Sequence, residues 1–271
     1  MVGIAGKSVV ITGGAGGIGA ALAARMLSLG ARVTIADLDP DRVAAAADQL
    51  GCDGHVCDVT SEQQIRALCE VAARRHGGPD IFVSNAGYMS PQPGHAASAS
   101  DAVWERSLAV HLMAYVYAAR AVLPGMLERG SGCLVNIASA AGLLNQIGDA
   151  AYSASKQAAV SFSESLAISH GADGLTVCLV CPQYVATPMI GLSDADADGS
   201  RGLLSADDVA ALICEGVLAD RFLILPHPEV RDYAMRRAED HDRWISGMQK
   251  LRTKAEKTLR TDGAGGLYKL L

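Results

Sequence analysis

Short apolar runs alternate along most of this chain with longer stretches that suit helices. The short runs are rich in β-branched residues, which is typical of buried strands, and we expect them at 7–12, 31–36, 54–57, 81–84, 133–138, 175–181 and 222–225. We expect helices over 20–29, 41–50, 61–76, 152–170 and 207–219, and a long one over 101–128 that Pro124 breaks or kinks. Strands separated by helices predict an α/β fold with a single doubly wound parallel sheet and helices on both faces.

The ends of the predicted strands carry most of the polar residues that suit a binding site. Ligands of such sheets bind beyond the carboxyl ends of the strands. We therefore expect one rim of the sheet to gather the glycine turn 13–19, Asp37, Asp58, Asn85, Ser139 and Pro182. Residues 1–228 are predicted to form this body, followed by a helical extension over 229–271.

A glycine-rich turn joins the first predicted strand to the first predicted helix. Glycines allow a tight turn that comes close to a pyrophosphate, and the helix N-terminus faces its charge. Asp37 ends the second strand, 20 residues after Gly17, where a carboxylate can accept hydrogen bonds from a ribose. A glycine-rich turn alone is most often only a turn, but strand, turn, helix, strand and acid together favour a Rossmann-like dinucleotide site.

Tyr152 and Lys156 lie four residues apart on a predicted helix, so their side chains share one face. A nearby ammonium favours the phenolate, and we expect it to lower the pKa of Tyr152. A cationic cofactor would add to this effect, and the tyrosine would then suit general base catalysis at neutral pH. Taken alone, an ordinary surface pair of these residues is the more common explanation.

Composition narrows the class of protein. The net charge of −6 and the pI near 5.6 argue against nucleic acid as a partner. No apolar run approaches the roughly 20 residues that span a bilayer, and no secretory signal is evident, so we expect a cytoplasmic protein without a membrane partner. The seven scattered cysteines suggest buried free thiols, and the Cys178–Cys181 pair lies in a predicted strand, so we expect no metal or redox site.

These motifs together resemble the short-chain dehydrogenase/reductase family over about residues 7–225. The family's glycine motif corresponds to Thr12, Gly13, Gly17 and Gly19, its Asn-Ala-Gly to residues 85–87, and its catalytic serine and Tyr-x-x-x-Lys to Ser139, Tyr152 and Lys156. The resemblance implies that Tyr152 exchanges the alcohol proton, that Ser139 holds the substrate oxygen, and that Lys156 lowers the tyrosine pKa and binds the nicotinamide ribose.

The resemblance also implies NAD as cofactor. Asp37 matches the family's NAD-preferring acid, because a carboxylate repels a 2′-phosphate, and we expect no cation beside it to neutralise such a phosphate. The implied cofactor contacts are Gly13, Gly17, Ile18, Gly19, Asp37, Leu38, Asp58, Val59, Asn85, Ala86, Gly87, Tyr152, Lys156, Val185 and Thr187. Family members commonly pair through the long helix and the tyrosine helix, which implies a homodimer or homotetramer.

Two residues depart from the family pattern. His111 stands where the family usually has an asparagine, whose main-chain carbonyl holds a water of the proton relay. We favour a tolerated replacement, and the sharper hypothesis is that His111 is a catalytic member of the relay and adds a pH dependence near its own pKa. Gln183 replaces the glycine after Pro182 and either narrows the nicotinamide site or reaches the substrate.

The expected substrate pocket combines apolar and uncharged polar side chains, without an arginine near the reacting end. Its expected lining is Tyr88, Ala140, Leu143, Leu144, Asn145, Gln146, Gln183, Tyr184, Met189 and Ile190. This predicts an uncharged, fairly apolar secondary alcohol or ketone as substrate of an NAD-dependent dehydrogenase or reductase. The alternatives are a weakly active or non-catalytic NAD-binding sensor or scaffold, and an NAD-using dehydratase or epimerase.

Two segments outside these motifs stay open. Residues 194–199 resemble the first half of a calcium loop, but Ser205 stands where the bidentate glutamate belongs, so an acidic lid is the better interpretation. Trp244, Met248 and Leu251 form a stripe at helical spacing in the extension. This stripe packs on its own core, packs on a neighbouring subunit or roofs a pocket.

Overall fold

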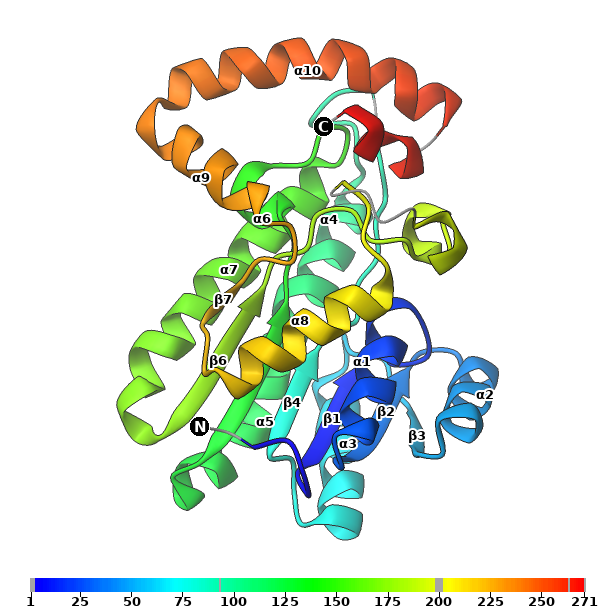
Figure 1. Cartoon of the computed structure of the whole chain (residues 1–271), viewed down its shortest axis with the longest axis vertical. Coiled ribbons are helices and arrows are strands. Elements are labelled where there is room, and N and C mark those ends of the chain that lie inside the picture. The colour runs from blue at the N-terminus through cyan, green and yellow to red at the C-terminus, as the bar shows by residue number, and fades with distance from the viewer. Residues whose placement is uncertain (1–2, 93, 198–201, 263, 271) are drawn as a thin grey trace.

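The computed structural model describes residues 3–92, 94–197, 202–262 and 264–270, and its centre is a parallel sheet (Figure 1). The seven strands follow the order β3-β2-β1-β4-β5-β6-β7, and all pairs are parallel. They are β1 (Ser8–Thr12), β2 (Arg32–Asp37), β3 (Asp53–Val56), β4 (Ile81–Ser84), β5 (Gly132–Ile137), β6 (Leu175–Val180) and β7 (Leu223–Ile224). The predicted doubly wound sheet is confirmed, with strand limits that differ by a few residues.

Helices cover both faces of the sheet. One core packs beneath α1 (Gly17–Ser28), α2 (Pro40–Leu50) and α8 (Ala206–Leu218), and the other beneath α3 (Glu62–His76), α5 (Ala114–Arg129) and α7 (Ala150–His170). Strand residues alternate between the two cores, as Val9 and Val10 do in β1. Because both faces of the strands are buried, their sequences are continuous apolar runs.

The long helix predicted over 101–128 is continuous but not uniform. It comprises α4 (Asp101–Leu108), a π-helical turn η1 (Ala109–Met113) and α5, which contains Pro124 and continues to Arg129. The expected break at Pro124 is therefore wrong, and the irregularity surrounds His111 instead. π-helical turns of this kind occur frequently at functional sites.

This long helix also meets the length and composition of a membrane span. Residues Asp101–Arg129 have a mean hydropathy of 1.3 in their most apolar window, and 44% of that window is buried inside the protein. The helix packs against α7 and α3 on one face of the sheet. Core helices of globular proteins satisfy the same criterion, so the finding is weak evidence for a membrane.

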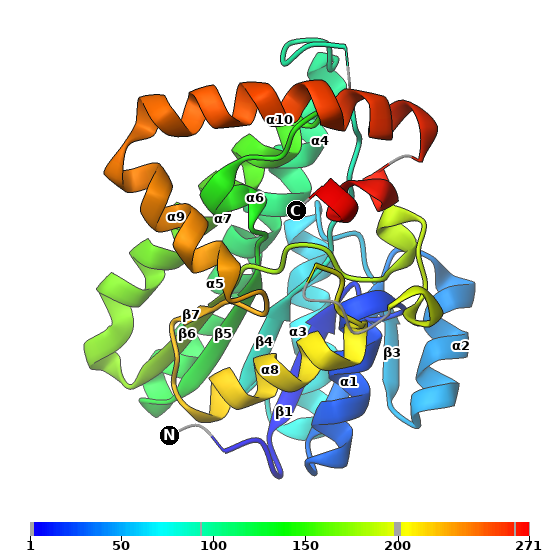
Figure 2. The same ribbon diagram turned by 45° about the horizontal axis from the view of Figure 1, so that its top comes forward.

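The C-terminal extension folds over one end of the sheet. It consists of α9 (Glu229–Glu239), α10 (His241–Thr261) and η5 (Ala264–Leu270), and α9 packs on the short α6 (Ala141–Leu144). In both views α10 stretches across the end of the molecule opposite the N-terminus (Figures 1 and 2). Three short 3-10 turns complete the described chain: η2 (Gly171–Asp173), η3 (Pro188–Ile190) and η4 (Asp194–Asp196).

Candidate active site

A cleft of about 1010 Å³ lies beyond the carboxyl ends of the central strands. It gathers nearly all of the residues that the sequence predicted for a dinucleotide site, from the segments that follow six of the strands, β1 to β6. These are Gly13, Gly17, Ile18, Asp37, Leu38, Asp58, Val59, Asn85, Ala86, Gly87, Ser139, Tyr152, Lys156, Val185 and Thr187. Gly19 and His111 are not part of the lining, and each lies behind it.

The glycine turn has the shape that a diphosphate requires. Gly17 has a φ of +52°, and a Cβ there would lie 3.2 Å from Thr187 across the cleft. A side chain at Gly19 would collide with the Gly13 carbonyl and the Asn85 amide. The helix α1 begins after Gly16 without a side-chain cap from the described residues, so its first N–H groups face the cleft. The turn therefore fits an anionic group held by backbone N–H groups.

The Asp37 carboxylate is held in place beside this turn. Its Oδ2 accepts a hydrogen bond from the Ala15 N–H at 3.2 Å, and its Oδ1 accepts one from the Leu38 N–H at 2.8 Å. The guanidinium of Arg42 on α2 reaches the same turn, where Nη2 donates to the Ala15 carbonyl at 3.4 Å. The expectation that no cation lies near Asp37 is therefore wrong. Arg42 belongs to the first turn of α2, and its side chain reaches back to the glycine turn.

The catalytic residues predicted from sequence meet at the N-terminal part of α7. Asp149 caps the helix by accepting a hydrogen bond from the Tyr152 N–H at 3.1 Å. The Lys156 ammonium donates to the Ile137 carbonyl at 2.9 Å and lies 5.8 Å from the centroid of the Tyr152 ring. Ser139 lies two residues after the end of β5, and its hydroxyl accepts a hydrogen bond from the Ala141 N–H at 3.1 Å. Strand β5 and helix α7 thus bring serine, tyrosine and lysine together.

Burial dominates the acid–base properties of this group. It raises the pKa of Tyr152 to about 12, although the neighbouring Ser139 hydroxyl partly offsets the rise, and it lowers the pKa of Lys156 to about 7. In the protein alone, the loss of hydration therefore outweighs any lowering of the Tyr152 pKa by Lys156, and that lowering stays a prediction for the complex with an oxidised cofactor. At neutral pH the phenol is protonated, which is the form that can donate a proton.

His111 bridges two parts of the site. Its Nε2 accepts a hydrogen bond from the Tyr88 N–H at 3.2 Å, so the proton belongs on Nδ1, which lies 2.9 Å from the Ser155 hydroxyl. Ser155 in turn donates to the Tyr152 carbonyl at 2.9 Å. Burial lowers the pKa of His111 to about 2. A pH dependence near the pKa of His111 itself would therefore fall near pH 2, and at neutral pH any part of His111 in the proton relay would be played by the neutral ring.

A second cavity of about 890 Å³ opens beside Ser139 under the C-terminal helices. Most of the predicted substrate-pocket residues line it: Ala140, Leu144, Asn145, Gln146, Gln183 and Tyr184. Tyr88, Met189 and Ile190 line the first cleft instead, while the Leu143 carbonyl accepts a hydrogen bond from Arg237 at 2.6 Å. The stripe of Trp244, Met248 and Leu251 forms its roof, so this stripe covers a pocket of its own chain.

The roof also brings charge to this cavity. Arg236, Glu239, Asp240 and Arg243 from the α9–α10 junction contribute to its lining, and the sequence analysis, which expected no arginine near the reacting end, did not place arginines in this pocket. These side chains are exposed to solvent, so they form a balanced rim rather than a buried clamp. No sequence pattern predicts this rim, because the path of the extension depends on its packing against α6.

Gln183 lines both cavities, so the two alternatives for this residue are not exclusive. Its backbone N–H donates to Nδ1 of the buried His227 at 3.1 Å, and Nε2 of His227 lies 3.0 Å from the Tyr184 carbonyl. His227 immediately precedes the turn into α9. The sequence analysis assigned no role to His227. Its hydrogen bonds connect residues 183 and 184, between the two cavities, to the segment that begins α9.

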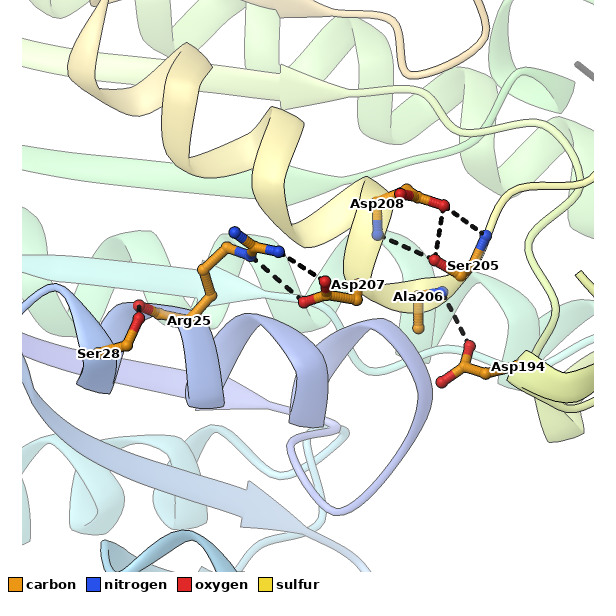
Figure 3. A network of polar contacts seen from close by, with 7 residues as sticks. All are labelled: Arg25, Ser28, Asp194, Ser205, Ala206, Asp207 and Asp208. Atoms are coloured by element: carbon orange, nitrogen blue, oxygen red, sulfur yellow. Dashed lines mark hydrogen bonds and ion pairs between the residues drawn. The ribbon is translucent and has the colours of Figure 1, made fainter. Parts of the chain in front are cut away.

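Three carboxylates hold the start of α8, one from the acidic segment before the helix and two from its own first turn (Figure 3). Asp194 accepts the Ala206 N–H at 3.0 Å, Asp208 accepts the Ser205 hydroxyl at 2.6 Å, and Asp207 pairs with Arg25 at 2.6 Å. Asp198 and Gly199, which the calcium motif also needs, lie outside the described residues. Across the described ranges, no group of three or more His, Cys, Asp or Glu residues is arranged to hold a metal ion.

Comparison with known proteins places this geometry in context. The family model described as "short chain dehydrogenase" matches residues 7–198. The chain is 34% identical to 1-deoxy-11-beta-hydroxypentalenate dehydrogenase of Streptomyces exfoliatus, covering 83% of this chain and 84% of that protein. It is 32% identical to (+)-borneol dehydrogenase 1 of Salvia officinalis, covering 90% of each. A solved short chain dehydrogenase/reductase from Burkholderia phymatum in complex with NAD superimposes with a TM-score of 0.81 at 31% identity, covering 89% and 96%.

Proposed function

This chain belongs to the short-chain dehydrogenase family, and from that membership we propose that it transfers hydride between NAD(H) and a bulky, uncharged secondary alcohol or ketone. The observation that carries the proposal is the position of Ser139, which lines both the dinucleotide cleft and the roofed cavity. Tyr152 and Lys156 lie on the cleft side of the same junction. A substrate oxygen at this junction would meet the phenol and the serine hydroxyl together.

Each residue has a distinct part in the proposed reaction. In ketone reduction, the protonated Tyr152 phenol donates its proton to the substrate oxygen while the Ser139 hydroxyl holds that oxygen. In alcohol oxidation, Tyr152 removes the proton, and this step requires the phenolate. The bound dinucleotide supplies or accepts the hydride, and an oxidised nicotinamide adds a positive charge that favours the phenolate. The cradle at Gly13, Gly17 and Gly19 would hold its diphosphate, and Lys156 its nicotinamide ribose.

A substrate panel followed at the nicotinamide absorbance tests the function. We expect turnover with apolar bicyclic or polycyclic secondary alcohols, little with acyclic acidic substrates, and a preference for NAD over NADP. A non-catalytic sensor would bind NADH without turnover of any substrate. A dehydratase or epimerase would convert substrate without net cofactor reduction, so product analysis separates it from the dehydrogenase.

Arg42 is expected to control discrimination between cofactors. Asp37 would accept the adenosine ribose hydroxyls, and Arg42 contacts the same Ala15 backbone. A 2′-phosphate there would gain a charge-assisted hydrogen bond from the guanidinium. We expect Arg42→Ala to weaken NADPH binding about tenfold and to leave NADH binding within about twofold, as measured by fluorescence titration.

Arg66→Ala is the matched control, because this arginine pairs with Glu62 on the exposed face of α3. Its affinities for both cofactors should equal those of the parent protein. Equal losses for NADH and NADPH in Arg42→Ala would show that the guanidinium supports the turn rather than reading a phosphate.

Trp244 is expected to set the size of accepted substrates. Its indole lines the cavity roof and packs near the buried Leu144 and Val230. Burial of a large apolar substrate surface against it contributes to binding in proportion to area. We expect Trp244→Ala to raise KM for a polycyclic substrate about tenfold or more, with kcat changed less than about twofold.

The adjacent Ile245 is 46% exposed and provides the control on the same helix. Steady-state kinetics of Ile245→Ala should match the parent protein with large and small substrates alike. A similar rise of KM in both variants would mean that α10 as a whole has shifted, and the specific role of Trp244 would be lost.

Assembly and location also remain proposals. We propose a homodimer or homotetramer that pairs through α5 and α7, on the grounds of family membership, and a cytoplasmic location. The exposed Leu127 of α5 and Ile168 of α7 are apolar positions that such pairing would cover. Light scattering at several protein concentrations tests the assembly.

A further inference from the structure

The Ile137 carbonyl at the end of β5 receives two hydrogen bonds from different helices. Lys156 on α7 donates to it at 2.9 Å, and the Tyr115 hydroxyl on α5 donates to it at 2.6 Å. The Tyr115 oxygen also lies 3.4 Å from Lys156 Nζ, where it accepts a weaker hydrogen bond. Lysine, tyrosine and carbonyl thus form a closed triangle of polar contacts directly behind the catalytic pair.

This triangle is almost entirely shielded from water. Tyr115 is 2% exposed and Lys156 is 3% exposed. An ammonium at such a depth depends on the acceptors that surround it, since hydration no longer stabilises its charge. The Ile137 carbonyl and the Tyr115 oxygen are the acceptors that the described residues place within hydrogen-bond distance of Lys156.

The ionisable neighbours of Lys156 provide no compensating negative charge. They are Tyr152 on α7, Tyr115 on α5, His111 in η1 and Cys181 after β6. Burial raises the pKa of both tyrosines and of the cysteine and lowers that of the histidine, so all four are neutral near pH 7. Neutral dipoles must therefore hold the lysine charge, and the phenol of Tyr115 is one of them.

We propose that Tyr115 is a positioning residue of the active site, whose phenol fixes the Lys156 ammonium beside Tyr152 and keeps it charged. The inference rests on the proposed role of Lys156 toward cofactor and tyrosine. Tyr115 acts through Lys156 and does not line either cavity itself. The centre of its ring lies 5.9 Å from Lys156 Nζ and that of Tyr152 lies 5.8 Å away, so the ammonium has the phenol of each tyrosine nearby.

The Tyr115→Phe variant isolates the hydroxyl, because the ring and its packing remain. Losing one acceptor should favour the neutral amine. We expect the midpoint for acylation of Lys156 by acetic anhydride, followed by mass spectrometry, to fall by about half to one pH unit. NADH affinity, measured by fluorescence, should begin to weaken at a correspondingly lower pH. Tyr117→Phe, on the same helix and only partly buried, should change neither midpoint.

Unchanged midpoints in a folded Tyr115→Phe protein, or equal shifts in Tyr117→Phe, would overturn the proposal. Tyr115→Leu provides a second variant without the hydroxyl if the phenylalanine form does not fold. The acylation midpoint needs neither cofactor nor substrate. Failure to turn over any alcohol would therefore contradict the proposed function alone, while an unmoved Lys156 midpoint would contradict the role of Tyr115 alone.

Discussion

Replacement of Tyr152 by phenylalanine will lower kcat by about a hundred- to ten-thousandfold, the range that a positioned general acid or base contributes. The substitution removes only the hydroxyl. The ring keeps its edge-on contact with His111 at 5.3 Å and its place beside the Lys156 ammonium. NADH affinity should therefore stay within about twofold of the parent value, because the glycine turn and Lys156 are unchanged.

The measurement combines steady-state kinetics in both directions with NADH titration. In the reduction direction, the parent rate should be nearly constant through neutral pH, because the pKa of Tyr152 near 12 keeps the phenol protonated. In the oxidation direction, the parent rate should rise with pH as more phenolate forms. Tyr152→Phe should lose this rise together with the rate.

Tyr184→Phe is the control for this experiment, because its phenol lines the roofed cavity on the far side of Ser139. It should change KM more than kcat. A Tyr152→Phe enzyme that kept more than about a tenth of the parent kcat would assign the proton transfer to another group. An equal loss in both variants would point to a disturbed pocket.

The fold followed from the sequence because its signals are local. Runs such as 7–12 and 133–138 are continuous and β-branched, which suits strands buried on both faces. The parallel topology then brings the carboxyl ends of all strands to one edge of the sheet. This arrangement is enough to place the glycine turn, Asp37, Asn85 and Ser139 around one cleft. The family resemblance added roles to residues whose proximity the topology already required.

The features that sequence reasoning missed depend on contacts between distant segments. The Arg42 side chain contacts the glycine turn from the first turn of α2. His227 accepts a hydrogen bond from the Gln183 N–H only because β7 brings residue 227 next to the segment after β6. No sequence motif distinguishes Tyr115 from other helix residues. Its hydrogen bonds to the Ile137 carbonyl and to Lys156 exist only because α5, α7 and β5 converge in the fold. The effect of burial on the pKa of Tyr152 was missed for a related reason, since the spacing of Tyr152 and Lys156 gives no measure of their burial.

His111→Asn should remove a large part of the acid sensitivity of this fold. In the folded protein the pKa of His111 is about 2, whereas an unfolded histidine titrates near 6.5. Above pH 6.5 both states carry the neutral ring, so the residue adds no pH dependence there. As the pH falls below 6.5, only the unfolded state takes up the proton, and unfolding becomes more favourable. At pH 5 this proton uptake lowers the free energy of unfolding of the parent protein by about 2 kcal/mol. The His111→Asn variant has no such group and should keep that stability.

The comparison is the change in unfolding free energy between pH 7 and pH 5, obtained from urea titrations of the parent and the variant. This difference cancels the constant effect of replacing the ring and its hydrogen bonds to Tyr88 and Ser155. Lys156, with a pKa of about 7 in the fold, is half protonated at pH 7 and adds a loss of about 0.4 kcal/mol between pH 7 and pH 5, and this loss is common to the parent and the variant. Burial also lowers the pKa of His227, so the variant should keep part of the acid loss.

His241→Asn, at an exposed position where α10 begins, should lose as much stability as the parent protein. If His111→Asn did so as well, His111 would have to accept a proton inside the fold near pH 6. That result would require Nε2 to give up the Tyr88 N–H, since a protonated imidazole has no acceptor. It would also place a positive charge 5.3 Å from the Tyr152 ring centre, and a His111 that titrates as part of the proton relay would then be the better explanation of this residue.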